Sequence, residues 1–184
     1  MISRNSRLSE AEAQAFDALA LARNGRALQD ETPVAGFARL CEGLPAPQDG
    51  MIAWRLAGRR DGQGNAWLDV QARGAVRVVC QRCLEAMDLP LDVANSLRLL
   101  ATQAEVDAMD ALEAGGQGDD VEYLVAEGRM DGLGLVEDEL ILAVPYAPRH
   151  AACAGGPDPA ADGKRNPDPG RPSPFAALGR LKQH

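Results

Sequence analysis

The sequence predicts an α+β fold in which an antiparallel β-sheet has helices before and after it. Apolar residues recur at near-helical spacing before residue 50 and again over residues 132–144, whereas they alternate with polar residues between Met51 and Val93. The chain has 184 residues, of which 46% are hydrophobic and 25% charged, a composition typical of one globular domain with tails. We expect a single α+β domain over residues 1–150 and a separate segment over residues 151–184.

Helices are expected over residues 9–43. Ser9 and Glu12 form a capping box before an alanine- and leucine-rich stretch that runs to about Arg23. Thr32 followed by Pro33 offers an N-cap with proline at the first helical position. A second, short helix should therefore end near Gly43.

Strands are expected over residues 51–100. Met51–Leu56 alternates, and a turn at Asp61–Gly64 leads into a second alternating run over Ala66–Val78. A third run, Met87–Val93, contains Pro90, which strands tolerate at an edge or a bulge. The prediction is an antiparallel meander of three or four strands with one buried face, either open or barrel-like.

An acidic insertion, a helix and a tail are expected after the sheet. The insertion covers residues 103–120 and contains a helix near residues 104–112, and residues 121–125 could add a strand. A C-terminal packing helix over residues 132–144 should carry Glu137, Asp138 and Glu139 on its outward side.

The composition of residues 151–184 predicts a linker followed by a docking peptide. Residues 151–174 are dominated by Gly, Pro, Asp and Ala, which indicates a flexible linker. Phe175, Leu178 and Leu181 then form a small amphipathic segment, which we expect to be a docking tail. The alternative is a terminus without a role.

Charge is unevenly distributed along the chain. The net charge is −8 and the pI about 4.8, and residues 101–150 alone hold 2 basic and 12 acidic residues. A nucleic-acid-binding domain usually has a pI above about 9, so nonspecific polyanion binding is a poor fit.

Four arginines nevertheless form a candidate basic face for RNA or a partner, because all fall on the predicted outward side of the sheet: Arg55, Arg73, Arg77 and Arg82. The alternative is a solvated sheet face, because Asp69 shares that side and no aromatic residue interleaves for base stacking.

Cys80 and Cys83 form a C-x-x-C motif between two strand-like runs. A knuckle between strands can present two sulfurs to a tetrahedral zinc ion, and His150 and Cys153 offer two further donors at the same spacing. These four residues are a candidate closed structural zinc site without an open catalytic position. Two alternatives remain, namely unligated cysteines in a reducing compartment and a thiol-redox pair, although no helix follows the motif as redox chemistry would favour.

Catalysis and membrane insertion are not expected. The sequence contains no phosphate loop, dinucleotide fingerprint or nucleophile elbow, so we expect neither an enzyme nor a small-molecule substrate. The longest uncharged apolar run, Leu140–Pro148, has nine residues, well short of the about 20 that span a bilayer. Because the N-terminus also lacks an apolar signal segment, a cytoplasmic location is expected.

Four motifs together resemble the bacterial YceD-like family, the large ribosomal RNA subunit accumulation proteins. They are Cys80–Leu84, Val136–Pro145, Pro148–Cys153 and Pro174–Lys182, which occur in this order within about residues 50–182. The resemblance implies a non-catalytic, cytoplasmic factor for synthesis, processing or stability of large-subunit (23S) ribosomal RNA in ribosome biogenesis. Its partner would be ribosomal RNA or a pre-ribosomal particle, reached through protein partners because the chain is acidic. A thiol-redox protein and a zinc-ribbon-like adaptor are the alternatives.

Overall fold

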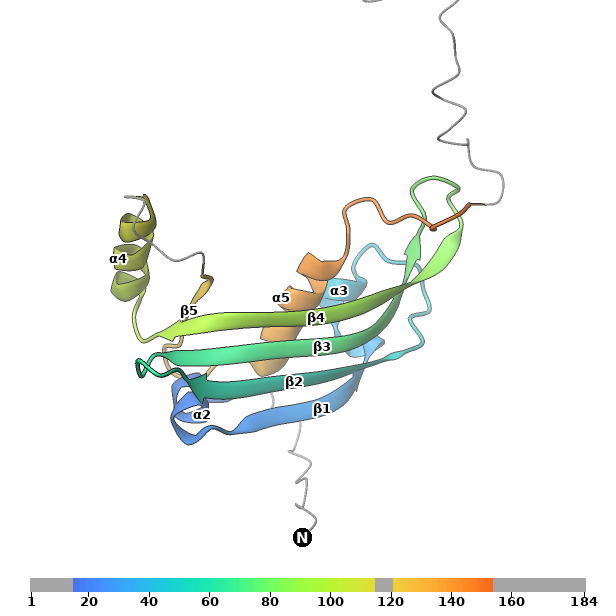
Figure 1. Cartoon of the computed structure of the whole chain (residues 1–184). Helices are drawn as coiled ribbons and strands as arrows, with labels where there is room; N and C mark the ends of the chain where they lie inside the picture. The colour runs from blue at the N-terminus through green and yellow to red at the C-terminus, as the bar shows by residue number, and fades with distance from the viewer. Residues whose placement is uncertain (1–14, 115–120, 154–184) are drawn as a thin grey trace, which may run out of the picture. The chain divides into compact units, whose positions relative to one another are not determined.

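A five-stranded sheet forms the centre of the computed structural model, which describes residues 15–114 and 121–153 (Figure 1). The strands lie side by side in chain order: β1 (Ala27–Pro33), β2 (Met51–Arg60), β3 (Ala66–Val79), β4 (Ala86–Leu100) and β5 (Tyr123–Val125). The first four are antiparallel to their neighbours, and β5 is parallel to β4. The sheet is not closed, because β1 and β5 are its two edges, so the barrel-like form is wrong and the open meander is confirmed.

The helices described in the structure are short and confirm the α+β class. They are α2 (Ala18–Asn24), the 3-10 helix η1 (Val34–Gly36), α3 (Ala38–Cys41), α4 (Gln103–Ala114) and α5 (Gly132–Ala143). The helices expected near residues 104–112 and 132–144 correspond to α4 and α5, and residues 123–125 do form a strand. None of the described helices has the length and apolar character needed to cross a membrane.

The region before residue 50 differs from the prediction, because it contributes an edge strand to the sheet. Helix α2 begins after Asp17, whose carboxylate accepts a hydrogen bond from the Ala20 amide at 2.7 Å. Thr32 and Pro33 end β1, and the Thr32 hydroxyl accepts a hydrogen bond from Trp54 Nε1 at 3.0 Å. The expected short helix follows directly, in two pieces, as η1 with Pro33 at its N-cap and then as α3. The predicted capping box at Ser9 lies outside the described residues.

The core lies between one face of the sheet and the helices. Alternate residues of β2 and β3, such as Ile52, Leu56, Leu68 and Val70, are fully buried on this face. Helix α2 packs directly on β2, because a Cβ on Gly58 would come within 2.4 Å of Ala22 N. On the opposite face of the sheet, the alternate residues of β2 and β3 are exposed or half-buried.

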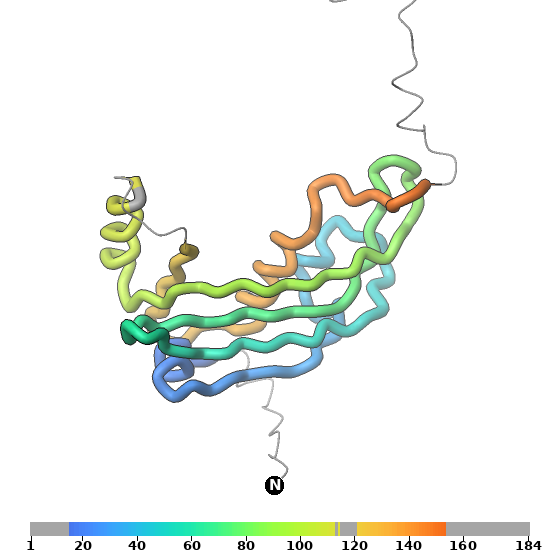
Figure 2. The backbone as a smooth tube through the Cα atoms, in the orientation of Figure 1, coloured from blue at the N-terminus to red at the C-terminus, as the bar shows by residue number. Residues whose placement is uncertain are grey.

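Helix α5 packs against α3 as well as against the sheet. Glu137, predicted to face outward, is 8% exposed and accepts hydrogen bonds from Arg39 N at 2.7 Å, Arg39 Nε at 2.8 Å and Leu40 N at 3.2 Å. Arg39 Nη1 also reaches Asp138 at 2.6 Å. Contact with α3 therefore turns the supposed solvent side of α5 into an interface. After α5 the chain continues to the loop that joins β3 and β4, as Figure 2 shows.

Candidate metal centre

The turn between β3 and β4 places the two cysteines of the C-x-x-C motif close together. Residues 80–85 connect the strands, and the loop is closed by hydrogen bonds from Cys80 N to Glu85 O and from Leu84 N to Cys80 O, both 2.9 Å. Leu84 has a φ of 62°, in the left-handed region that non-glycine residues rarely adopt. This backbone reversal brings Ala86 opposite Val79, where the pairing of β4 with β3 begins.

The segment after α5 brings the other two donors to the same loop. The α5 helix ends at Ala143, and the chain then runs past Pro145 to Pro148. Gln81 N donates a hydrogen bond of 2.8 Å to Pro148 O, which holds this segment against the β3–β4 loop. His150 follows two residues later, and Cys153 is the last described residue.

The four predicted metal ligands lie together. One donor atom from each of Cys80, Cys83, His150 and Cys153 falls within 4.8 Å of all the others, and Cys83 Sγ is 3.3 Å from His150 Nδ1. Four donors around a tetrahedral zinc ion, with Zn–S bonds of 2.3 Å, lie about 3.8 Å from one another. Three thiols and one imidazole at these separations are therefore a donor set that fits zinc.

Cys80 is the most deeply placed of the four ligands and has a perturbed thiol. It is fully buried, whereas the other three are half-buried. Burial opposes ionisation, but hydrogen bonds from the backbone of Cys83, His150 and Arg82 outweigh it and lower the pKa of Cys80 to about 5. The sulfur is consequently a thiolate at neutral pH, which is the form that binds metal ions and also the form that reacts with oxidants.

The fourth cysteine of the chain lies elsewhere and behaves as a core residue. Cys41 is half-buried at the end of α3, and its Sγ donates to Val34 O at 3.3 Å. Burial raises the pKa of the Cys41 thiol. Cys41 is not part of the donor cluster, as expected for a cysteine in an apolar helical stripe.

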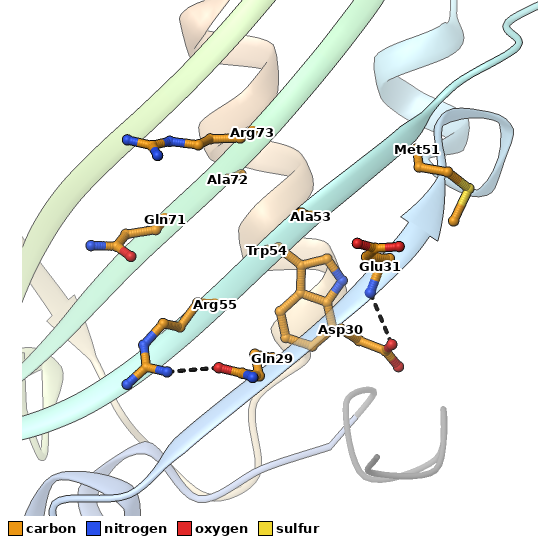
Figure 3. Close-up of a pocket in the computed structure, with 10 residues that line it drawn as sticks. All are labelled: Gln29, Asp30, Glu31, Met51, Ala53, Trp54, Arg55, Gln71, Ala72 and Arg73. Carbon is orange, nitrogen blue, oxygen red and sulfur yellow. Dashed lines mark hydrogen bonds between the residues drawn. The ribbon is translucent and has the colours of Figure 1, made fainter. Parts of the chain in front are cut away.

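The predicted basic face is only partly assembled. Arg55 and Arg73 point to the same side of the sheet and line a shallow groove with Gln29 and Gln71 (Figure 3). Arg55 Nη1 donates to Gln29 Oε1 at 2.7 Å. Arg82, however, lies in the β3–β4 loop between the two cysteines, so its predicted place on the sheet is wrong.

Acidic side chains of β4 offset two of the sheet arginines. Arg73 Nε lies 2.8 Å from Asp92 Oδ1, and Arg77 Nε lies 3.4 Å from Asp88 Oδ1. These cross-strand pairs follow from a register in which Arg73 stands opposite Asp92 and Arg77 opposite Asp88. The solvent face of the sheet is therefore a mixed-charge surface rather than a basic one.

The predicted docking tail, Phe175, Leu178 and Leu181, lies outside the described residues.

Comparison with known protein families finds a match to this chain. A family model described as "Large ribosomal RNA subunit accumulation protein YceD" matches residues 68–182, more than half of the chain. The matched span starts in β3 and includes both halves of the cysteine and histidine cluster. No curated protein and no solved structure matches the chain.

Proposed function

Because the chain belongs to the YceD family of large ribosomal RNA subunit accumulation proteins, we propose that it is a non-catalytic factor for the synthesis, processing or stability of 23S ribosomal RNA. The family description supports a role connected with large-subunit ribosomal RNA. The cytoplasm, where ribosomes are assembled, is the location that suits this role.

The closed donor set of the candidate metal centre is the observation that favours a structural over a catalytic role. Three thiols and an imidazole complete a tetrahedral coordination sphere and leave no position for a substrate or a reactive water. A bound zinc ion would join the β3–β4 loop to the segment after α5. The cluster then serves to hold two parts of the domain in one arrangement.

Contact with the ribosomal particle through proteins, rather than through naked RNA, is supported by the charges of the sheet. Three arginines of β2 and β3, namely Arg59, Arg73 and Arg77, are paired with aspartates, and the chain has a net charge of −8. RNA binding gains most of its affinity from unpaired cationic groups near phosphates, and stacking needs exposed aromatic rings. On this face aspartates offset these arginines, and the rings of Trp67 and Tyr123 already have Arg59 and Arg98 over them.

The test is the ratio of large- to small-subunit ribosomal RNA in cells with and without the gene, together with a sedimentation profile of the ribosomal particles. We expect a selective loss of the large-subunit species without the gene, restored by the intact gene and by Cys41→Ser. An unchanged ratio would refute the proposed function. Failure of Cys83→Ser to restore the ratio would assign the role to the metal centre.

A thiol-redox function is the second candidate, because the pKa of Cys80 is lowered to about 5 and Cys83 is its neighbour in the cluster. This candidate predicts that iodoacetamide modifies Cys80 rapidly whether or not a chelator is present. A structural metal centre predicts slow modification that accelerates when a chelator is added.

A further inference from the structure

Exposed apolar side chains gather at one end of the described domain. Among the residues that the structure describes, six large hydrophobic side chains are exposed, and four of them belong to the β3–β4 loop, to the end of α5 or to the segment that follows it: Leu84, Ile141, Leu142 and Tyr146. The exposed fraction is 79% for Leu142 and 103% for Tyr146, so neither side chain contributes to the core. Single exposed apolar residues are common, but a group of them marks an interaction site.

Acidic groups lie on the same side of α5 as Leu142. Asp138 and Glu139 precede Leu142 by four and three positions, the spacings that place side chains next to each other on a helix. Asn95 Nδ2 donates both to Glu122 at 2.6 Å and to Glu139 at 3.2 Å, and among the described residues neither carboxylate forms an ion pair with a basic side chain. Burial raises the pKa of Glu139, the hydrogen bond from Asn95 lowers it, and the nearby carboxylates of Glu122 and Asp138 raise it further.

Leu84 adds an apolar group held in an unfavourable conformation. Its left-handed φ of 62° costs a non-glycine residue about 1–2 kcal/mol, and its 74% exposed side chain gains no burial in return. The hydrogen bond from Gln81 N to Pro148 O places this loop beside the segment that carries Tyr146. A strained residue whose side chain is exposed is expected where that side chain meets a partner.

We propose that this end of the domain, the α5 surface formed by Leu84, Asp138, Glu139, Leu142 and Tyr146, docks a basic amphipathic segment of a protein partner. Tyr146 and the two leucines provide apolar anchors, as buried aromatic and aliphatic side chains do in interfaces. Glu139 and the adjacent Glu122, which have no basic partner among the described residues, can pair with lysine or arginine, whereas Asp138 already pairs with Arg39. The stretch around them, residues 101–150, holds 12 acidic and 2 basic residues.

The proposal rests on the proposed function for the identity of the partner. Proteins that bind ribosomal RNA carry lysine- and arginine-rich segments, because these neutralise phosphates. A factor that acts on large-subunit RNA meets such segments on the assembling particle. The same acidic charge that disfavours RNA binding favours binding of these basic proteins, and it also accelerates their association with this chain at low salt.

Site-specific photo-crosslinking in the full chain tests the proposal. The substitution Leu142→p-benzoylphenylalanine places the reactive group on the α5 surface, and the same group at Gln71 on the solvent face of the sheet is the control. We expect ultraviolet light to join position 142, but not position 71, to a basic protein that co-sediments with large-subunit particles. The replacement Tyr146→Ser should reduce that adduct at least fivefold, whereas Leu112→Ser, a change of an exposed apolar residue on α4, should leave it unchanged.

Other adducts would overturn the proposal. Position 142 joined to RNA, to a second copy of this chain or to residues 174–182 of the same chain would identify a different occupant, and no adduct would mean that the surface is not covered. The outcomes distinguish a failure of the docking proposal from a failure of the proposed function. A basic-protein adduct in cells whose ribosomal RNA ratio is independent of the gene supports docking and refutes the function, whereas a gene-dependent ratio without that adduct does the reverse.

Discussion

Replacing Cys83 by serine tests whether a metal ion joins the β3–β4 loop to the segment after α5. Cys83 and His150 are 67 positions apart, and a cross-link that closes a loop of this length restricts the unfolded chain by about 4 kcal/mol at 25 °C. For a domain of this size, 1 kcal/mol corresponds to about 2–4 °C in the unfolding midpoint. Loss of the metal should therefore lower the midpoint by roughly 8–16 °C.

The assay is calorimetry of the full chain, with zinc and after treatment with a chelator. The unfolding midpoint of the unsubstituted chain should fall on chelation. Cys83→Ser should bind less zinc, and its midpoint should change little when chelator is added. Cys41→Ser is the matched control, because Cys41 lies outside the cluster and its thiol donates to the Val34 carbonyl. Equal effects of chelator on the unsubstituted chain and on Cys83→Ser would refute the reasoning, and so would loss of zinc from Cys41→Ser.

Three further predictions concern stability. Glu137→Gln should lower the free energy of unfolding by about 2 kcal/mol in urea at pH 7, because a buried charged acceptor of three hydrogen bonds is lost, and an unchanged value would contradict this account. Because the folded-state pKa of Glu139 is raised, its carboxylate destabilises the fold progressively as pH rises through the unfolded and folded pKa values. Glu139→Gln should accordingly stabilise the protein at pH 7 and lose that advantage below about pH 4, whereas a pH-independent effect would argue against the assignment. Gly58→Ala should destabilise the fold by about 2–3 kcal/mol, because its Cβ meets backbone atoms of α2, while Gly62→Ala, in open space, should have little effect in the same thermal melts.

The sheet could be predicted from the sequence wherever one face of a strand is buried. β2, β3 and β4 alternate because every second residue faces the helices. β1 could not be identified in this way, because only Leu28 is buried and its other residues are half-buried or exposed. Its pairing with β2 is a long-range contact, so Thr32 and Pro33, read locally, show only the helical turn that begins at Val34 and not the strand that precedes it.

The side chain of Glu137 shows a similar limit at the level of packing. Three consecutive acidic residues on an amphipathic helix indicate a solvated side, and Asp138 is exposed as predicted. The short helix α3 nevertheless packs against this side, and its backbone amides and Arg39 satisfy the Glu137 carboxylate. Nothing in the sequence near residue 137 specifies which element covers it.

The candidate metal centre could be predicted from the sequence because its motif is local and occurs twice. Each half of the cluster shows two donors separated by two residues, and the chemistry of cysteine and histidine identifies the class of ligand. The arginine face was harder to predict, because its charge depends on the register between β3 and β4. The sequence does not reveal that Asp88 and Asp92 stand opposite Arg77 and Arg73.

The division of the cluster between two distant parts of the chain has a consequence for protein synthesis. The chain is made from its N-terminus at about 5–20 residues per second, so the 67 positions between Cys83 and His150 take about 3–13 s to translate. During this interval the β3–β4 hairpin carries two thiols whose remaining donors have not yet been made. During this stage oxidants and foreign metals can reach Cys80 and Cys83. A reducing environment is therefore needed most before the domain is complete.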